Sequence, residues 1–269
     1  MHNSFIGMFD SGVGGLTVAA AIYDLLPNEQ LVYFADNSRA PYGPKSPEAV
    51  FSYSREITTM LIERGAKLIV VACNTATSVA IDRLREEFPD VPFVGMEPAV
   101  KPAAEQTRNG KIGILATQMT LESERYHSLL DRFAQGAEVY SDPCVGLVPL
   151  IETGELNNPL LEQKVRPIIE PMLAAGVDTV ALGCTHYPLI ERLIKQLAGP
   201  GVEIINPAPA AARRVTQLLE EYKLKNDSLP FKPLHRFYTS GDSRGVTAIL
   251  SKMDFSRRLI NPNYPVARP

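Results

Sequence analysis

The sequence has little that would staple the chain or hold it in a membrane. Three cysteines are spread widely over 269 residues, and this odd number predicts free thiols in a reducing cytoplasm rather than a disulfide framework. No apolar run reaches the roughly 20 residues that span a bilayer, so no membrane partner is expected. The first residues show no basic leader before an apolar stretch, which argues against an export signal.

An excess of positive charge is also missing. The formal net charge is −3 at pH 7, which gives no general attraction for phosphate backbones, so nucleic acid is not an expected partner. The composition is 45% hydrophobic and 21% charged, which is typical of a globular protein without long disordered tails. A chain of this length can bury one large core or two of ordinary size.

Short apolar runs rich in β-branched residues alternate with longer segments of helical period. This alternation predicts the α/β class, with parallel sheets flanked by helices. The expected strands are Phe5–Phe9, Leu31–Ala35, Leu68–Ala72, Pro92–Gly95, Lys111–Ala116, Ala137–Tyr140, Thr179–Leu182, Val202–Ile205 and Arg236–Thr239. The expected helices are Leu16–Leu25, Pro47–Arg64, Ser78–Glu87, Leu121–Phe133, Pro159–Ala175, Leu189–Leu197, Ala208–Glu221 and Arg244–Lys252.

Two strand-and-turn units recur in the same order in the two halves of the chain. Ile6-Gly7 and Cys73 mark the first pair, and Ile112-Gly113 and Cys184 mark the second at nearly the same spacing. A divergent duplication explains this recurrence, and chance similarity between generic apolar strands is the alternative.

A duplication predicts two similar doubly wound α/β domains related by a pseudo-twofold axis. We expect residues 1–98 plus 207–269 in the first domain and residues 99–206 in the second. The loops after the strands of both domains would then meet in one cleft, where open parallel sheets bind ligands. Cys73 and Cys184 would lie on its opposite walls.

Both of these cysteines end an apolar run and precede hydroxyl and amide residues, with a helix expected soon after. Free backbone N–H groups at a helix N-terminus favour a thiolate and also bind carboxylates. One such cysteine would be interpreted as a small buried hydrophobe, but two matched occurrences favour a function for Cys73 and Cys184. Cys144 has no such setting, and we interpret it as a packing or loop residue.

A zinc site is an alternative at the second cysteine, because Cys184 and His186 are two residues apart and thiolate with imidazole suits zinc. Supporting ligands are missing from the sequence. There is no CxxC or HxxxH pattern, and of the four histidines only His186 lies near a cysteine. The sequence therefore predicts no metal site.

Several turns are suited to a ligand. Asp10–Thr17 runs from a strand into a helix, as in many anion-binding loops, and matches neither the Walker nor the GxGxxG pattern. Asp10 is either a helix cap or a proton-transfer group. Pro41-Tyr42-Gly43 is a stiff turn that either presents amides to a carboxylate or only reverses the chain. Residues 95–99 and 206–208 likewise either contribute to a ligand site or only form turns. The role of Asn206 stays open.

Taken together, the motifs resemble the glutamate racemases of the aspartate/glutamate racemase superfamily. In chain order they are DSGVGG at 10–15, PYG at 41–43, CNTAT at 73–77, MEPA at 96–99 and GCTHYPL at 183–189. The match runs from Gly7 to about Pro209, and the residues beyond carry little that is diagnostic. The resemblance implies two α/β domains around one active site, and interconversion of L- and D-glutamate without pyridoxal phosphate, other cofactor or metal, supplying D-glutamate for peptidoglycan.

By the same resemblance, Cys73 and Cys184 are the two catalytic thiols, and Asp10 and His186 assist them. Cys184 would take the α-proton from L-glutamate and Cys73 from D-glutamate. The implied substrate-binding residues are Asp10, Ser11, Pro41, Tyr42, Gly43, Asn74, Thr75, Thr185 and His186.

Two thiols make chemical sense for such a reaction. Inverting a stereocentre by proton exchange removes hydrogen from one face and returns it to the other, so groups on opposite walls are needed. One must be a thiolate while the other is a thiol, and a carboxylate or imidazole nearby helps to move the proton. Because no electron sink is visible, preorganised donors must stabilise the carbanion-like state; these are backbone N–H groups and the side chains of Ser11, Asn74, Thr75 and Thr185.

Other functions stay open at this point. A racemase for aspartate or another acidic amino acid would use the same scaffold, and a related decarboxylase would need only the second cysteine. A non-catalytic ligand-binding protein also has two α/β lobes, but it gives no reason for matched thiols. We expect the enzyme to be a homodimer.

Overall fold

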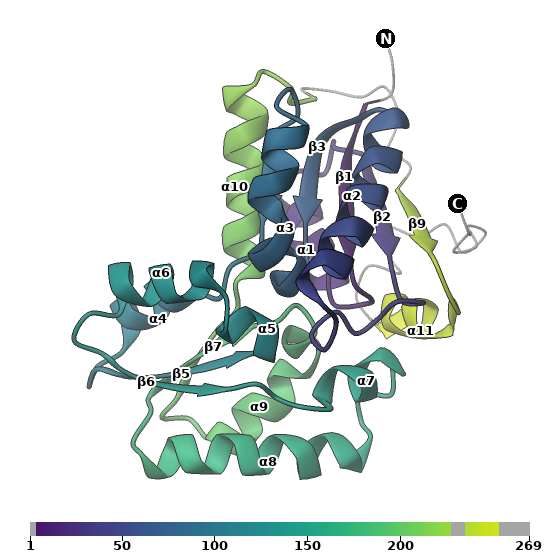
Figure 1. The fold of residues 1–269 in the computed structure, drawn as a ribbon. Coiled ribbons are helices and arrows are strands. Elements are labelled where there is room, and N and C mark those ends of the chain that lie inside the picture. Colours follow the sequence, from purple (N-terminus) through teal and green to yellow (C-terminus); the bar gives the residue numbers. More distant parts are fainter. Residues whose placement is uncertain (1–3, 227–234, 253–269) are drawn as a thin grey trace.

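The structure, a computed structural model, describes residues 4–226 and 235–252. It contains two parallel sheets, one above the other in Figure 1, with helices on both faces of each. The first sheet has the order β4-β3-β1-β2-β9 and the second the order β6-β5-β7-β8. The strands are β1 Phe5–Asp10, β2 Leu31–Ala35, β3 Ala66–Val71, β4 Phe93–Gly95, β5 Lys111–Ala116, β6 Glu138–Asp142, β7 Thr179–Gly183, β8 Glu203–Ile205 and β9 Arg236–Thr239.

The topology of the two sheets confirms the expected duplication. Read from its other edge, the second sheet is β8-β7-β5-β6, which repeats the order β4-β3-β1-β2 of the first. Register agrees as well, because Gly7 of β1 pairs with Ile69 of β3, and Gly113 of β5 pairs with Val180 of β7. The two cysteines therefore follow equivalent strands, β3 and β7. The domain boundaries expected above stay a prediction.

Helices cover both faces of each sheet. They are α1 Leu16–Leu25, α2 Pro47–Glu63, α3 Asn74–Glu87, α4 Val100–Gln106, α5 Gln118–Leu121, α6 Glu124–Phe133, α7 Leu147–Glu152, α8 Pro159–Ala174, the 3-10 turn η1 Tyr187–Ile190, α9 Glu191–Ala198, α10 Ala208–Glu221 and α11 Arg244–Lys252. No helix among the described residues has the length and apolar character to cross a membrane.

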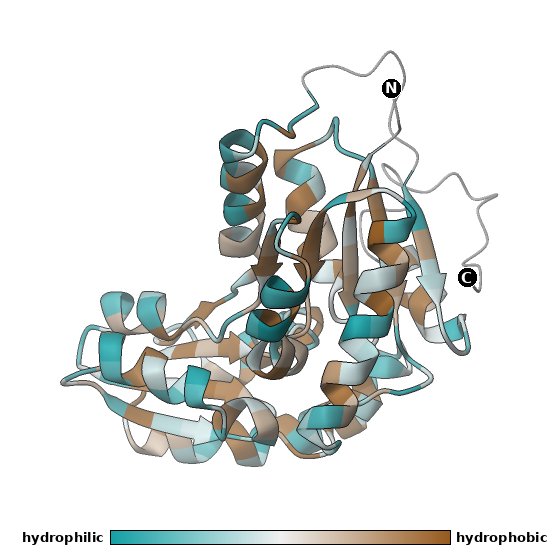
Figure 2. Cartoon of the chain, turned by 45° about the horizontal axis from the view of Figure 1, so that its top comes forward, coloured by the Kyte–Doolittle hydropathy of each residue, from teal (hydrophilic) through white to brown (hydrophobic). Residues whose placement is uncertain are grey.

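Each sheet is the centre of two apolar layers. Side chains of α1, α10 and α11 pack on one face of the first sheet, and those of α2 and α3 pack on the other. The second sheet is covered by α7, α8 and α9 on one face and by α4 and α6 on the other. Figure 2 shows the hydrophobic residues concentrated on strands and inward helix faces. Burial of this apolar surface is the main force that stabilises both layers.

All nine expected strands are present; three have the expected ends, and the ends of the others differ by one or two residues. The helices differ from the expectations in more places. The helix expected at 121–133 is divided into α5 and α6, because Ser123 is extended (ψ 143°) and its side chain caps the second piece by accepting from Tyr126 N. The helix expected at 189–197 begins as a 3-10 turn containing Pro188. Helices α4 and α7 were not anticipated, and α3 begins at Asn74 rather than Ser78.

Candidate active site

The carboxyl ends of three strands bring the chemically active side chains together. Asp10 ends β1, Cys73 follows β3, and Cys184 follows β7 of the other sheet. All three side chains are buried, with Asp10 fully inaccessible and each cysteine 5% exposed. Strand ends of parallel sheets are the usual place for a ligand, and here the ends of both sheets contribute to one site.

Cys73 belongs to the first half of this site. Its Sγ caps helix α3 by accepting from Ala76 N at 3.4 Å, and its thiol contacts Ser11 Oγ at 3.7 Å. Ser11 Oγ in turn donates to Asp10 Oδ1 at 3.3 Å. Gly12 N donates to the same carboxylate oxygen at 2.8 Å. The chain of contacts thus runs from a thiol to a buried carboxylate.

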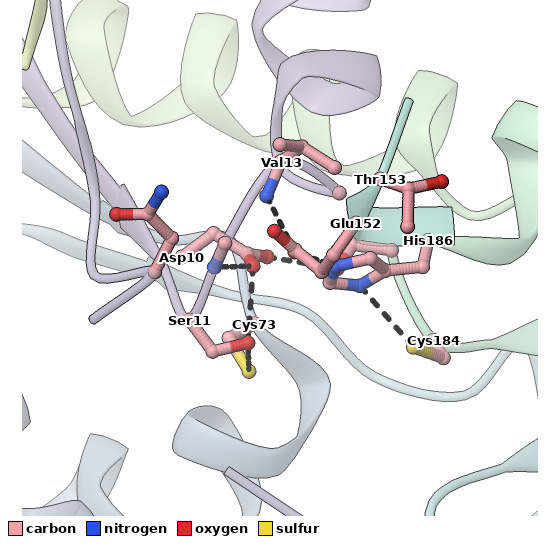
Figure 3. Close-up of polar contacts among 12 residues, drawn as sticks. Asp10, Ser11, Val13, Cys73, Glu152, Thr153, Cys184 and His186 are labelled. Atoms are coloured by element: carbon pink, nitrogen blue, oxygen red, sulfur yellow. Dashed lines mark hydrogen bonds and ion pairs between the residues drawn. The ribbon is translucent and has the colours of Figure 1, made fainter. Parts of the chain in front are cut away.

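Cys184 belongs to the second half. Its Sγ lies 3.7 Å from His186 Nδ1, and His186 Nε2 lies 2.5 Å from Glu152 Oε1. The same Glu152 oxygen accepts from Val13 N at 2.9 Å, which joins α7 to the loop after β1. Figure 3 shows Cys73 and Cys184 at separate ends of one polar cluster. On the side of Cys184, the sulfur thus contacts an imidazole, and the imidazole contacts a carboxylate.

One hydrogen bond connects the two halves. Thr185 Oγ1 donates to Asp10 Oδ2 at 2.8 Å, so both oxygens of the Asp10 carboxylate are satisfied by the protein. Thr17 Oγ1 also contacts Thr185 O at 3.4 Å. The two sulfur atoms are close enough that a charge on Cys184 raises the pKa of Cys73.

The surroundings shift the pKa values of Cys73 and of His186. Burial, together with the charge of Asp10, raises the pKa of the Cys73 thiol to about 12, so this thiol keeps its proton. Burial lowers the pKa of His186, but its hydrogen bonds and charge interactions with Cys184 and Glu152 outweigh that effect and raise this pKa well above its ordinary value. His186 is therefore an imidazolium between Cys184 and Glu152.

Burial also raises the pKa of Asp10, although the charge of His186 and hydrogen bonds from Thr185 and Gly12 oppose the rise. A carboxyl group shifted in this way can exchange a proton more readily than an exposed one. The structure thus gives Asp10 a hydrogen-bonded place in the cluster instead of a simple helix cap.

The remaining implied binding residues lie around this cluster. Asn74 begins α3 and is 2% exposed; within the described part of the chain neither its Nδ2 nor its Oδ1 has a hydrogen-bond partner. Thr75 Oγ1 and Thr117 Oγ1 lie 2.8 Å apart and join the two halves. Tyr42 OH donates to Asp36 Oδ2 at 2.5 Å, which holds the turn Pro41-Tyr42-Gly43.

A side chain at Gly43 would bring its Cβ within 3.3 Å of Thr117 Cβ, so this turn also reaches the second sheet. A cavity of about 630 Å³ opens beside the cluster, and Pro41, Glu152 and Gly245 are among its lining residues. Pro41 thus lines this cavity, and Tyr42 beside it is buried.

Sequence reasoning missed two of these residues. Glu152 is a single carboxylate in the short helix α7, and no motif next to it marks it. Thr117 could have been found, because it follows β5 as Ser11 follows β1 in the duplicated units.

Two residues outside the cluster have structural contacts. Asn206, whose role the sequence left open, holds a turn: its side chain accepts from Ala208 N at 3.0 Å and donates to Glu191 Oε2 at 3.1 Å. Cys144 packs in the core beside α7, as expected.

No group of three or more His, Cys, Asp and Glu side chains with the geometry of a metal site occurs in residues 4–226 or 235–252. The zinc alternative at Cys184 and His186 therefore finds no third ligand among them, and His186 instead uses its second nitrogen to contact Glu152.

Comparison with known proteins gives the family. The sequence model for "Asp/Glu/Hydantoin racemase" matches residues 16–215, about three quarters of the chain. The chain belongs to this racemase family. Its members include a glutamate racemase from Pseudomonas putida strain F1, which is 49% identical over 247 residues, 91% of this chain and 92% of the relative.

Solved structures of this racemase family have the same fold. A glutamate racemase from Bacillus anthracis superposes with a TM-score of 0.83 at 37% identity, covering 93% of this chain and 94% of that one. The Escherichia coli glutamate racemase, solved with L-glutamate and the activator UDP-MurNAc-Ala, gives a TM-score of 0.81 at 35% identity and covers 93% and 94%. The racemase fold predicted from the motifs is thus confirmed.

Proposed function

We propose that this protein interconverts L- and D-glutamate by a two-thiol proton transfer that needs no cofactor. The observation that carries the proposal is the pair of buried thiols at equivalent strand ends of two duplicated sheets, Cys73 and Cys184, joined by one hydrogen-bonded cluster. The Escherichia coli relative binds L-glutamate, which supports glutamate as the substrate.

The charge distribution of the free site supports a defined starting state. His186, with its raised pKa, is an imidazolium that stabilises a thiolate on Cys184, while the raised pKa of Cys73 keeps that group a thiol. This is the mixed state that inversion requires: one base and one acid on opposite sides of a carbon. The Glu152 carboxylate balances the imidazolium charge.

The reaction then consists of two proton transfers. The Cys184 thiolate removes the α-hydrogen of L-glutamate as a proton, and the electron pair of the broken C–H bond stays on the α-carbon and its carboxylate. The Cys73 thiol delivers its proton to the other face, which forms the new C–H bond and leaves Cys73 as the thiolate. D-glutamate reacts by the same steps in reverse, so the two cysteines exchange roles.

Stabilisation of the carbanion-like intermediate is assigned to donors that follow β3 and β7. The Asn74 amide, which has no hydrogen-bond partner among the described residues, and the hydroxyls of Thr75 and Thr185 are assigned to bind the substrate carboxylate and ammonium groups. Such fixed dipoles are most effective where water is excluded, and burial of the cluster supports this requirement.

The wider setting follows from the family. We expect the enzyme to work in the cytoplasm, where D-glutamate enters peptidoglycan synthesis, and to form a homodimer. Residues 1–98 plus 207–269 and residues 99–206 are proposed as the domains that enclose the substrate. Light scattering with size-exclusion chromatography tests the dimer, because a monomer mass at working concentration would contradict it.

Racemisation in D₂O tests the proposed function. With purified protein and no added cofactor, each glutamate enantiomer should yield its mirror image with deuterium at the α-carbon, and aspartate assayed alongside should react far more slowly. Cys73→Ala and Cys184→Ala should each lose racemisation. Normal turnover by either variant, or retention of the substrate hydrogen in the product, would refute the two-thiol scheme.

A further inference from the structure

Asp36 is a fully buried carboxylate that the mechanism so far does not use. It follows β2 as the next residue, beside the end of β1, and its backbone N–H donates to Asp10 O at 2.9 Å. A carboxylate is costly to remove from water, so a buried one needs partners that offset this cost. Asp36 has two side-chain partners, Arg39 and Tyr42, and both belong to the loop that contains Pro41-Tyr42-Gly43.

The two carboxylate oxygens of Asp36 have different donors. Oδ1 accepts from Arg39 Nε at 3.0 Å, and Oδ2 accepts from Tyr42 OH at 2.5 Å. Burial and the charge of Asp36 raise the pKa of Tyr42, so the phenol keeps the proton that it donates. The Arg39 guanidinium also lies 4.4 Å from the centre of the Tyr53 ring. One buried carboxylate thus holds two residues further along the same loop.

The beginning of this loop is held separately. Asn37 Oδ1 accepts from Gly241 N at 2.9 Å, and Asn37 Nδ2 donates to Asp242 O at 2.6 Å. These contacts join the loop to the segment after β9. They do not reach Tyr42, whose side chain is held by its hydrogen bond to Asp36 and by packing in the apolar cluster of α2 and α3.

The held part of the loop offers two backbone donors next to the catalytic cluster. Among the described residues, neither Tyr42 N nor Gly43 N has an acceptor. Gly43 lies against Thr117 of the second sheet, and Pro41 lines the cavity beside the cluster. Backbone N–H groups of a turn bind anions well. Glutamate carries a side-chain carboxylate that takes no part in the proton transfer, and this group matches the two donors.

We propose that Asp36 is a positioning residue: by accepting from Arg39 and Tyr42, it holds the backbone N–H groups of the turn where they bind the side-chain carboxylate of the substrate. This inference rests on the proposed function. The carboxylate is remote from the reacting carbon, so its binding is the same before and during proton transfer. Weakening that binding should therefore raise KM and leave kcat unchanged.

Asp36→Asn is the first test. Asparagine keeps the shape of the side chain but replaces one acceptor oxygen by an NH₂ group, so it cannot accept from Arg39 and Tyr42 together. Loss of a hydrogen bond to a charged group weakens an interaction by about a factor of ten or more. Steady-state assays should show KM raised about tenfold for both L- and D-glutamate, with kcat within about twofold of the wild type.

Tyr42→Phe is a milder second variant. It removes only the hydroxyl of the 2.5 Å contact and keeps the ring in its apolar cluster. It should raise KM for both enantiomers, again with kcat retained. Combined with Asp36→Asn, it should raise KM by less than the product of the two single effects, because both variants act through one contact.

Glu56→Gln is the matched control, because it removes a carboxylate from the exposed side of the same guanidinium. Glu56 Oε2 accepts from Arg39 Nη1 at 2.8 Å, and the Glu56 side chain is 68% exposed. Exposed pairs of this kind contribute little, so this variant should keep the wild-type KM and kcat.

The outcomes separate the inference from the function beneath it. Wild-type KM values for Asp36→Asn and Tyr42→Phe, in a protein whose wild type racemises glutamate, would overturn the role of Asp36 alone. A fall in kcat at unchanged KM would also overturn it, because it would indicate a displaced Asp10 instead of weakened substrate binding. Single effects that multiply in the double variant would show that the two residues act independently, against the proposal. Absence of racemisation by the wild type would instead overturn the proposed function.

Discussion

Replacing Glu152 by Gln tests the sulfur, imidazole, carboxylate arrangement most directly. The carboxylate contacts His186 Nε2 at 2.5 Å and accepts from Val13 N at 2.9 Å. Glutamine preserves the size and one acceptor oxygen but removes the charge. Since hydrogen bonding and charge from Glu152 help to raise the pKa of His186, the variant should hold its imidazolium, and hence the Cys184 thiolate, less strongly.

The size of the effect follows from the bond that is weakened. A hydrogen bond to a charged group contributes about 1.5–3 kcal/mol. At about 1.4 kcal/mol for each factor of ten, kcat/KM should fall roughly tenfold to a hundredfold. The fold should change little, because the backbone of α7 is packed through Leu147, Val148 and Ile151.

The assay uses both enantiomers. L- and D-glutamate have the same free energy in water, so kcat/KM must fall by the same factor in the two directions. The asymmetry appears in primary deuterium isotope effects: removal of deuterium from L-[2-²H]glutamate by Cys184 becomes more rate-limiting, and removal from D-[2-²H]glutamate by Cys73 becomes less so. The isotope effect should therefore rise for the L-enantiomer and fall for the D-enantiomer.

Glu86→Gln is the matched control, because it removes the same charge from an exposed position on α3 that does not line the cavity beside the cluster. It should retain wild-type kinetics. The reasoning is wrong if Glu152→Gln keeps wild-type kcat/KM, or if its isotope effects move equally for both enantiomers.

Three further outcomes are expected. Gly14→Ala should lower kcat/KM at least tenfold, because the added Cβ would lie 2.5 Å from His186 Nδ1; wild-type kinetics would contradict this. Burial lowers the pKa of His235 from its ordinary 6.5 to about 4, so on acidification the unfolded chain binds this proton before the folded chain does. Lowering the pH from 6.5 to 4 should therefore reduce the free energy of unfolding, measured by urea titration, by up to about 3 kcal/mol. His235→Asn should remove this pH dependence. Lys67→Met should destabilise the fold by about 3 kcal/mol in the same assay, because the buried Glu29 loses its cationic partner at 2.7 Å and keeps only the hydrogen bonds from Asn226.

Strands were predicted well because their signal is local. A run such as Leu68–Val71 is apolar on both faces, and only a strand inside a covered parallel sheet buries both faces at once. Helix ends were predicted less well because they depend on caps. Cys73 caps α3 with its sulfur, and cysteine is not among the residues that ordinarily signal a helix start.

The helices that were missed are short and depend on contacts with distant residues. Helix α7 has six residues, too few to be stable alone, and it forms where Leu147 and Ile151 pack on the second core. Its last residue, Glu152, enters the site through Val13 and His186, which are far away in sequence. No local pattern could have placed that carboxylate in the cluster.

The sequence by itself determined the α/β class, the duplication and the identity of both thiols, because strand periodicity and the repeated motifs are properties of short segments. Only the tertiary structure decided which groups contact each sulfur. Cys184 contacts His186 and, through it, Glu152, while Cys73 lies with Ser11 and Asp10. Those partners come from different strands and sheets, and burial strengthens the interactions between their charges, so the surroundings of two residues of the same type are made different by folding.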